Sequence, residues 1–177
     1  MAIIRRIESA EPHVIDGLCA LLIDAVHDGA SVSFLAPLSH DTAMRYWNQA
    51  LASPGDGLVL WVAESRGEIV GTVQLSLCAK ENGRHRAELQ KLLVLRSHRG
   101  NGIATALMRA ADEYASANGR TLLVLDTIAG SPAESVYRHL GWRKAGEIPE
   151  YAAMPGGELR ATAYYYKRCP PGTESRA

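Results

Sequence analysis

The 177-residue sequence has no excess of charge of either sign, since 19 lysines and arginines balance 19 aspartates and glutamates. Proteins that bind nucleic acid or anionic membranes usually carry a basic excess, so this balance argues against both kinds of partner. Arg96, His98 and Arg99 form a small local basic patch. That segment is either a solvated loop or a place where phosphate is paired.

Cysteine is scarce, and long apolar runs are missing. The three cysteines, Cys19, Cys78 and Cys169, form no CxxC pair, and their odd number does not suggest a disulfide framework. Residues 1–12 lack the apolar segment of a signal peptide, and no apolar run is long enough to cross a bilayer. We therefore expect a cytoplasmic protein in a reducing compartment, with no membrane partner.

Metal-ligand motifs are also missing. The six histidines are scattered along the chain, and neither an HExxH nor a GxSxG motif occurs. Structural and catalytic zinc sites need closely spaced His and Cys ligands. We expect no metal site.

What the sequence does contain is regular apolar periodicity, with a hydrophobic content of 47% that is typical of a globular chain. The pattern predicts strands at 3–7, 58–64, 69–77, 87–95, 121–126, 142–148 and 161–167, and helices at 14–26, 41–51, 103–117 and 133–140. Short turns join three of the early strands, which should be antiparallel. We predict an α/β (α+β) fold with a mixed, mostly antiparallel sheet, in a single domain 1–168 followed by a flexible tail 169–177.

The most informative segment is Arg99-Gly100-Asn101-Gly102-Ile103-Ala104, which lies between a predicted strand and a predicted helix. Backbone amides at such a turn, together with the positive end of the helix dipole, form a seat for phosphate. A dinucleotide fingerprint is disfavoured because Thr105 stands where Gly or Ala is wanted and because the preceding strands are antiparallel. No Lys-Ser/Thr pair follows the glycines, so the segment is not a Walker A loop.

Arg99-x-x-Gly102-x-Ala104 resembles the pyrophosphate-binding signature of the GNAT N-acetyltransferases, and Val136 to Trp142 resembles the late tyrosine segment of that family. The resemblance extends over most of the chain. It implies a GNAT-like sheet of about seven strands and about four helices, with acetyl-CoA as co-substrate and an amine as acceptor. Gly130 departs from the family pattern, which usually has Asn seven residues before the tyrosine.

The same resemblance implies which residues bind the cofactor. Backbone groups would hold the pantetheine arm along one strand and the pyrophosphate at the glycine turn, the residues being Leu92, Leu93, Val94, Arg99, Gly100, Asn101, Gly102, Ile103, Ala104 and Thr105. The Val94 N–H would serve as oxyanion donor. Tyr137 would act as acid for the leaving thiolate, and it could equally be a core aromatic on a helix face.

Two carboxylates are candidates for removing the proton from the amine. Glu88 is expected on the same strand face as Leu92 and Val94, and Asp126 at the end of a neighbouring strand. Acids at strand ends often line the sites of α/β sheets. The alternatives are a salt bridge for Glu88 and a turn or helix cap for Asp126.

Acceptor specificity should come from two loops, 27–38 and 149–162, because long loops in compact domains are often functional. Four stretches, such as Val26 to Val32 and Gly146 to Tyr151, resemble the branch of the family that confers resistance to the β-lactam toxin tabtoxin. A small-molecule amine, including a tabtoxinine-like compound, is the expected acceptor. A peptide N-terminus and a non-catalytic acetyl-CoA-binding module remain alternatives, and the chain is expected to be a monomer or homodimer.

Overall fold

The computed structural model describes residues 2–9, 11–52 and 57–170. Its seven strands are β1 (Ile3–Ile7), β2 (Leu58–Ser65), β3 (Glu68–Leu77), β4 (Arg86–Val94), β5 (Leu122–Ile128), β6 (Arg143–Ala153) and β7 (Leu159–Arg168). They form one sheet in the order β1-β2-β3-β4-β5-β7-β6. Every neighbouring pair is antiparallel except β4 and β5, which are parallel. The predicted mixed, mostly antiparallel sheet is confirmed.

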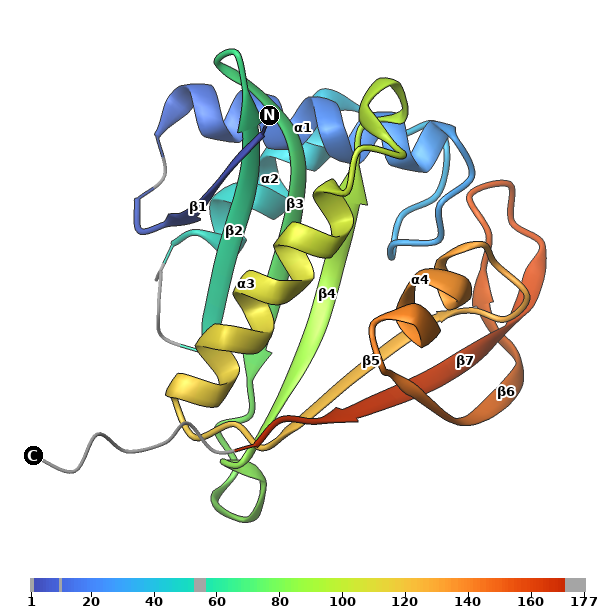
Figure 1. Cartoon of the computed structure of the whole chain (residues 1–177). Helices are drawn as coiled ribbons and strands as arrows, with labels where there is room; N and C mark the ends of the chain where they lie inside the picture. Colours follow the sequence, from blue (N-terminus) through green and yellow to red (C-terminus); the bar gives the residue numbers. More distant parts are fainter. Residues whose placement is uncertain (1, 10, 53–56, 171–177) are drawn as a thin grey trace, which may run out of the picture.

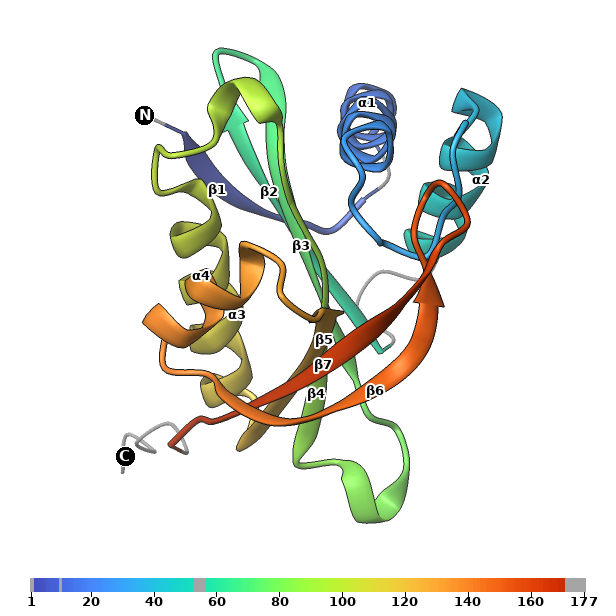
Figure 2. The ribbon, with the colours of Figure 1, turned by 90° about the vertical axis from the view of Figure 1, so that its right-hand side faces the viewer.

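The described residues also form the four α-helices expected, in two layers. Figure 2 shows one pair of helices on each face of the sheet. The helices are α1 (Pro12–His27), α2 (His40–Ala50), α3 (Ile103–Ala117) and α4 (Ala133–His139), and two 3-10 turns are η1 (Glu81–Gly83) and η2 (Arg96–His98). The pair α1 and α2 covers one face, and α3 and α4 cover the other.

Each helix layer buries its own apolar core against the sheet. On the α1 and α2 side, Leu18, Leu22 and Trp47 are fully buried. On the α3 side, Leu107 and Met108 are fully buried. Apolar residues three and four apart on each helix produce these stripes, because such residues share one face of a 3.6-residue turn.

Local signals fix the limits of the helices. Pro12 occupies the first turn of α1, where its missing N–H would have had no helical partner. Gly29, with φ +88°, ends the same helix in a conformation that other residues avoid. The Ser39 hydroxyl caps α2 by accepting from the Thr42 N–H at 3.2 Å.

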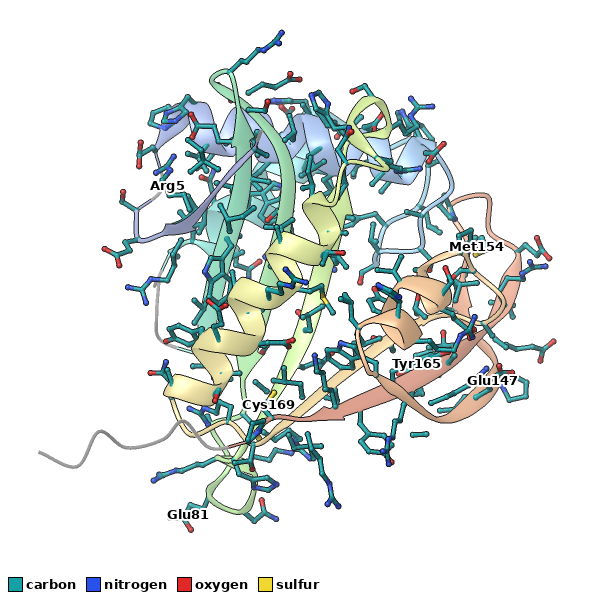
Figure 3. All side chains as sticks on the ribbon, viewed as in Figure 1. Arg5, Glu81, Glu147, Met154, Tyr165 and Cys169 are labelled. Atoms are coloured by element: carbon teal, nitrogen blue, oxygen red, sulfur yellow. The ribbon has the colours of Figure 1, made fainter. Side chains whose placement is uncertain are left out.

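The last hairpin differs from the prediction, because most of the expected loop 149–162 is strand. The turn itself is short: Met154 N–H donates to the Glu158 carbonyl at 2.7 Å, and Gly157 N–H donates to the Met154 carbonyl at 2.8 Å. Pro149 is tolerated because β6 is an edge strand and its register shifts between Ile148 and Ala152. Met154 therefore lies at the tip of a long hairpin (Figure 3).

The C-terminal boundary also needs a correction at one residue. Cys169, expected in a flexible tail, is buried in the core on the α3 side, and its N–H donates to the Thr121 carbonyl at 3.0 Å. An apolar thiol next to the last strand is better placed in the core than in water. Residues 171–177 of the predicted tail lie outside the described residues.

Candidate active site

The site begins where the sheet opens between its two parallel strands. β4 and β5 pair over only three residues each, Arg86–Glu88 with Leu122–Val124. Beyond that point both strands continue but diverge, as Figure 1 shows. The edge of β4 that faces β5 is thereby left open from Leu89 to Val94, in reach of an extended ligand.

The backbone of Val94 faces this opening. Leu95 N–H donates to the Val70 carbonyl of β3 at 3.0 Å. In an antiparallel ladder the backbone groups of successive residues point to opposite edges of the strand, so those of Val94 point away from β3. Accordingly, the Val94 carbonyl accepts from Arg99 Nε at 3.3 Å instead of from β3. This direction is the one that the predicted oxyanion donor requires.

The glycine turn lies just past the open end of β4. Gly100 and Gly102 have φ of 80° and 75°, and Gly102 is the N-cap of α3. The first four amides of an α-helix have no partner inside the helix, so those from Gly102 to Thr105 are available to an anion. The structure brings this turn to the open edge of β4, as the predicted cofactor site requires.

The arginine side chains near the turn are engaged by α1. Arg99 Nη1 lies 2.6 Å from the Asp28 carboxylate, and Arg96 Nε lies 2.8 Å from the Asp24 carboxylate. The hydrogen bond to Asp24 raises the pKa of Arg96. These pairs tie the end of α1 to the segment before the glycine turn, and the amides from Gly102 to Thr105 remain the donors available to an anion.

A bulge in β4 changes the faces that its residues occupy. The register against β3 shifts between Gln74 and Thr72, and Lys91 has φ +50° within the shift. One extra residue moves all later side chains to the opposite face. Glu88 therefore lies on the α1 and α2 face, whereas Val94 lies on the α3 face. The prediction that Glu88 shares a face with Leu92 and Val94 is wrong, because simple alternation does not include the bulge.

Glu88 and Asp126 do share one face of the sheet. Glu88 is opposite Val124 in the parallel register, and Asp126 follows Val124 by two residues. The Glu88 carboxylate accepts from Gln90 Nε2 at 2.9 Å. Partial burial, followed by the charge of Glu88, raises the pKa of Asp126, while Lys91 opposes the shift. The two candidate bases thus face α1 and α2 where β4 and β5 part.

Tyr137 lies on α4, within the core on the other face. Its ring packs at 6.2 Å from that of Trp142 and at 6.0 Å from that of Tyr165. Burial, together with the charge of Asp126, raises the pKa of Tyr137 to about 12. A thiol has a pKa of about 8.5, so a phenol with this raised pKa can donate a hydrogen bond to a thiolate but is a poor source of a full proton. Core packing and this function are compatible.

A buried acid that the sequence analysis did not single out fixes α4. Glu134 is 4% exposed and accepts from the Gly130 N–H at 2.8 Å, from Arg138 at 3.2 Å and from the Tyr165 hydroxyl. Tyr165 is labelled beside α4 in Figure 3. The spacing of Glu134 and Arg138 on one helix face was the available signal. Through the Gly130 N–H, Glu134 fixes the segment in which this chain departs from the family pattern.

The two predicted specificity loops meet over the face that carries Glu88 and Asp126. Ala36 N–H donates to the Pro155 carbonyl at 2.9 Å, and Ser31 Oγ lies 3.5 Å from the Ala153 carbonyl. Figure 2 shows the β6–β7 hairpin reaching the segment between α1 and α2. The two loops therefore form a bridge over the sheet face that carries Glu88 and Asp126.

Tyr164 and Tyr151 add phenol groups next to the carboxylates. Tyr164 is opposite Asp126 in the β5–β7 register, and its ring lies 5.6 Å from that of Tyr151 in an edge-on arrangement. Burial, followed by the hydrogen bond with Tyr151, raises the pKa of Tyr164. Tyr151 lies in the predicted specificity loop 149–162. Tyr164 was not predicted at the site, because only the pairing of β7 with β5 brings it next to Asp126.

Within the described residues, no group of three or more His, Cys, Asp or Glu side chains could hold a metal ion. Over the same part of the chain, no helix is both long and apolar enough to cross a membrane.

Comparisons with known proteins agree with this geometry. The model of the Acetyltransferase (GNAT) family matches residues 23–142. Because the match covers more than half of the chain, the protein belongs to the GNAT family of acetyltransferases. The matched segment includes the whole glycine turn, Glu88, Asp126 and Tyr137.

Curated relatives match over part of their length only. N-acetyltransferase 8 of Rattus norvegicus is 41% identical over 99 residues, which is 55% of this chain and 44% of that protein. The chain spans less than half of the length of the curated relatives that it matches.

Solved structures share the fold at low identity. A phosphinothricin acetyltransferase from Sinorhizobium meliloti in complex with AcCoA has a TM-score of 0.78 and 20% identity, covering 97% of this chain and 90% of that one. A ribosomal-protein-alanine N-acetyltransferase from Brucella melitensis has a TM-score of 0.77 and 23% identity, covering 94% and 99%. The names of these two proteins give phosphinothricin and a ribosomal-protein alanine as acceptors on the same fold.

Proposed function

We propose that the protein is an acetyl-CoA-dependent N-acetyltransferase that acts on a small-molecule amine by direct attack in a ternary complex. The observation that carries the proposal is the opening between β4 and β5. A glycine turn lies at its outer end, and two carboxylates flank its inner end. The AcCoA complex of a structural neighbour supports the choice of cofactor.

In this proposal the cofactor is held by backbone groups. The amides from Arg99 to Thr105 bind the pyrophosphate, because they combine unpaired donors with the positive end of α3. The open edge of β4, from Leu92 to Val94, pairs with the pantetheine arm. The Val94 N–H then donates to the thioester oxygen as negative charge develops on it.

The acceptor amine must be neutral to attack, and it is mostly protonated near pH 7. Glu88 or Asp126 accepts that proton, and the raised pKa of Asp126 makes it a stronger base than a free aspartate. The amine nitrogen then bonds to the carbonyl carbon, and the carbon–sulfur bond breaks. Tyr137 donates a hydrogen bond to the departing sulfur. The second proton leaves the amine nitrogen and ends on that sulfur, so the products are the N-acetyl amide and the CoA thiol.

The bridge between the loops supports a small acceptor. Ala36 and Pro155 are joined across the acceptor face, so a long peptide would have to separate them. Compounds that resemble tabtoxinine belong in the first acceptor panel, and a role in toxin resistance is part of this proposal. The named protein acceptor of the Brucella melitensis relative makes a peptide N-terminus the second candidate.

Thermal unfolding tests the cofactor. A ligand at 100 times its Kd stabilises a protein by about 2.7 kcal/mol, which corresponds to roughly 5–10 °C in Tm for a chain of this size. We expect acetyl-CoA to raise the Tm and NADH to leave it unchanged. Release of free CoA thiol with a panel of amines then separates an enzyme from a binding module. A Tm that rises with NADH alone would overturn the proposal.

A further inference from the structure

Lys91 has an environment that ordinary surface lysines do not have. It occupies the bulge of β4 with φ +50°, a conformation that disfavours residues other than glycine. Its ammonium lies 5.4 Å from the centre of the Tyr46 ring and 3.3 Å from the Ser33 hydroxyl. The bulge thus directs a half-buried cation to the face that carries Glu88 and Asp126.

No carboxylate among the described residues lies within ion-pair distance of this ammonium. Glu88 and Asp126 act on it only at longer range, and burial lowers the pKa of Lys91 despite them. A half-buried cation without an anionic partner is unfavourable, and an aromatic face and one hydroxyl compensate only in part. A carboxylate from a ligand would complete the environment.

The charges on this face are complementary to those of a zwitterion. Two carboxylates stand where the amine is deprotonated, and one ammonium stands beside them. An acceptor that carries both an amine and a carboxylate matches both signs. A purely cationic amine would be repelled by Lys91, and an internal peptide residue offers an amide in place of the carboxylate.

We infer that Lys91 binds the carboxylate of the acceptor, and that the acceptor is therefore an amino acid or a similar zwitterion. The inference rests on the proposed function, since it requires the amine to lie at Glu88 and Asp126. Ser33 and Tyr46 position the ammonium, which makes the loop between α1 and α2 part of the specificity site.

The experiment uses matched acceptor pairs, free amino acids and their α-amides, with CoA thiol release as readout. The amide keeps the amine and lacks the negative charge. We expect the wild type to favour the acid over the amide by roughly 10- to 100-fold in kcat/KM, the range of a hydrogen bond to a charged group. In Lys91→Met this ratio should fall towards one, because kcat/KM for the acid falls while that for the amide stays the same. Lys91→Arg, which keeps the positive charge, should retain part of the preference for the acid.

Lys80→Met is the matched control, because it removes the same charge from an exposed residue beyond the site. It should keep the wild-type ratio, and both variants should keep the Tm rise with acetyl-CoA. If Lys91→Met slows acid and amide equally, or if the wild type shows no preference for the acid, the inference is overturned while the proposed function stands. If acetyl-CoA is neither bound nor consumed with any amine, both fail.

Discussion

At the scale of residues, the candidate site holds a carboxylate, Asp126, in an environment that disfavours its ionised form. Asp126 lies on the same sheet face as Glu88, and its pKa is raised by partial burial and, to a smaller extent, by the charge of Glu88. A pKa that is higher in the folded state means that stability is lost as pH rises from the ordinary Asp value through the raised one. At neutral pH the ionised Asp126 therefore lowers the free energy of unfolding. Such strain is common at functional sites.

This sign predicts the behaviour of Asp126→Asn. The variant should lose kcat by roughly 10²- to 10⁴-fold, the range of a general base, and should have a Tm equal to or above that of the wild type at pH 7. The difference in Tm should shrink as pH falls through the raised pKa and vanish below the ordinary Asp value, where the carboxyl is protonated in both the folded and the unfolded chain. Thermal scans from about pH 3 to about pH 8, together with thiol release, measure both effects. A large drop in Tm at pH 7 would show that Asp126 is a structural capping residue instead.

At the scale of elements, the glycine turn depends on a conformation rather than on close packing. A Cβ at Gly100 or Gly102 would meet no atom within 4 Å, yet both residues have positive φ. The left-handed region costs about 1–2 kcal/mol for a residue with a side chain. The conformation of the glycine turn therefore depends on its backbone angles. These angles set the direction of the free amides at the N-terminus of α3.

Gly102→Ala should accordingly lower stability by about 1–2 kcal/mol and weaken acetyl-CoA binding. Gly119→Ala is the control. Gly119 lies just after the other end of α3, has φ +68°, and a Cβ there would also meet no atom within 4 Å. We expect similar losses of Tm in both variants and a higher Kd for acetyl-CoA in Gly102→Ala alone, measured by calorimetry. Equal affinities for acetyl-CoA in the two variants would show that the glycine turn does not bind the cofactor.

Most elements could be predicted from the sequence because their signals are local. Apolar stripes and turn residues located the strands, the helices and the glycine turn. The bulge at Lys91 could not be predicted, because nothing about a lysine signals a positive φ. It reversed the face of Glu88 relative to Val94. The approach of Tyr164 to Asp126 was also hidden, since it depends on β7 lying between β5 and β6.

At the scale of the whole molecule, two loops far apart in sequence close one side of the site. The contacts Ala36 to Pro155 and Ser31 to Ala153 join the α1–α2 segment to the last hairpin. Each such hydrogen bond contributes about 1 kcal/mol. Under the proposed function, the bridge acts as a size filter for acceptors.

The filter predicts a preference among acceptors that share one N-terminal residue. A free small amine should show a kcat/KM roughly 10- to 30-fold above that of a pentapeptide, because the peptide must break two hydrogen bonds of the bridge. Thiol release with the two acceptors measures the ratio. A pentapeptide that reacts as fast as the free amine would contradict the filter and favour a protein substrate.

The short pairing of β4 with β5 has a consequence for the cohesion of the fold. Three residues on each strand join the half-sheet β1-β2-β3-β4, which leads into the glycine turn, to the half-sheet β5-β7-β6, which carries Asp126 and packs against Tyr137. Under the proposed function, the pantetheine arm acts as the missing strand between them. Amide hydrogens of β5 and β7 should then exchange more slowly once the cofactor is bound, because the co-substrate that is consumed in each turnover also fastens the two halves together.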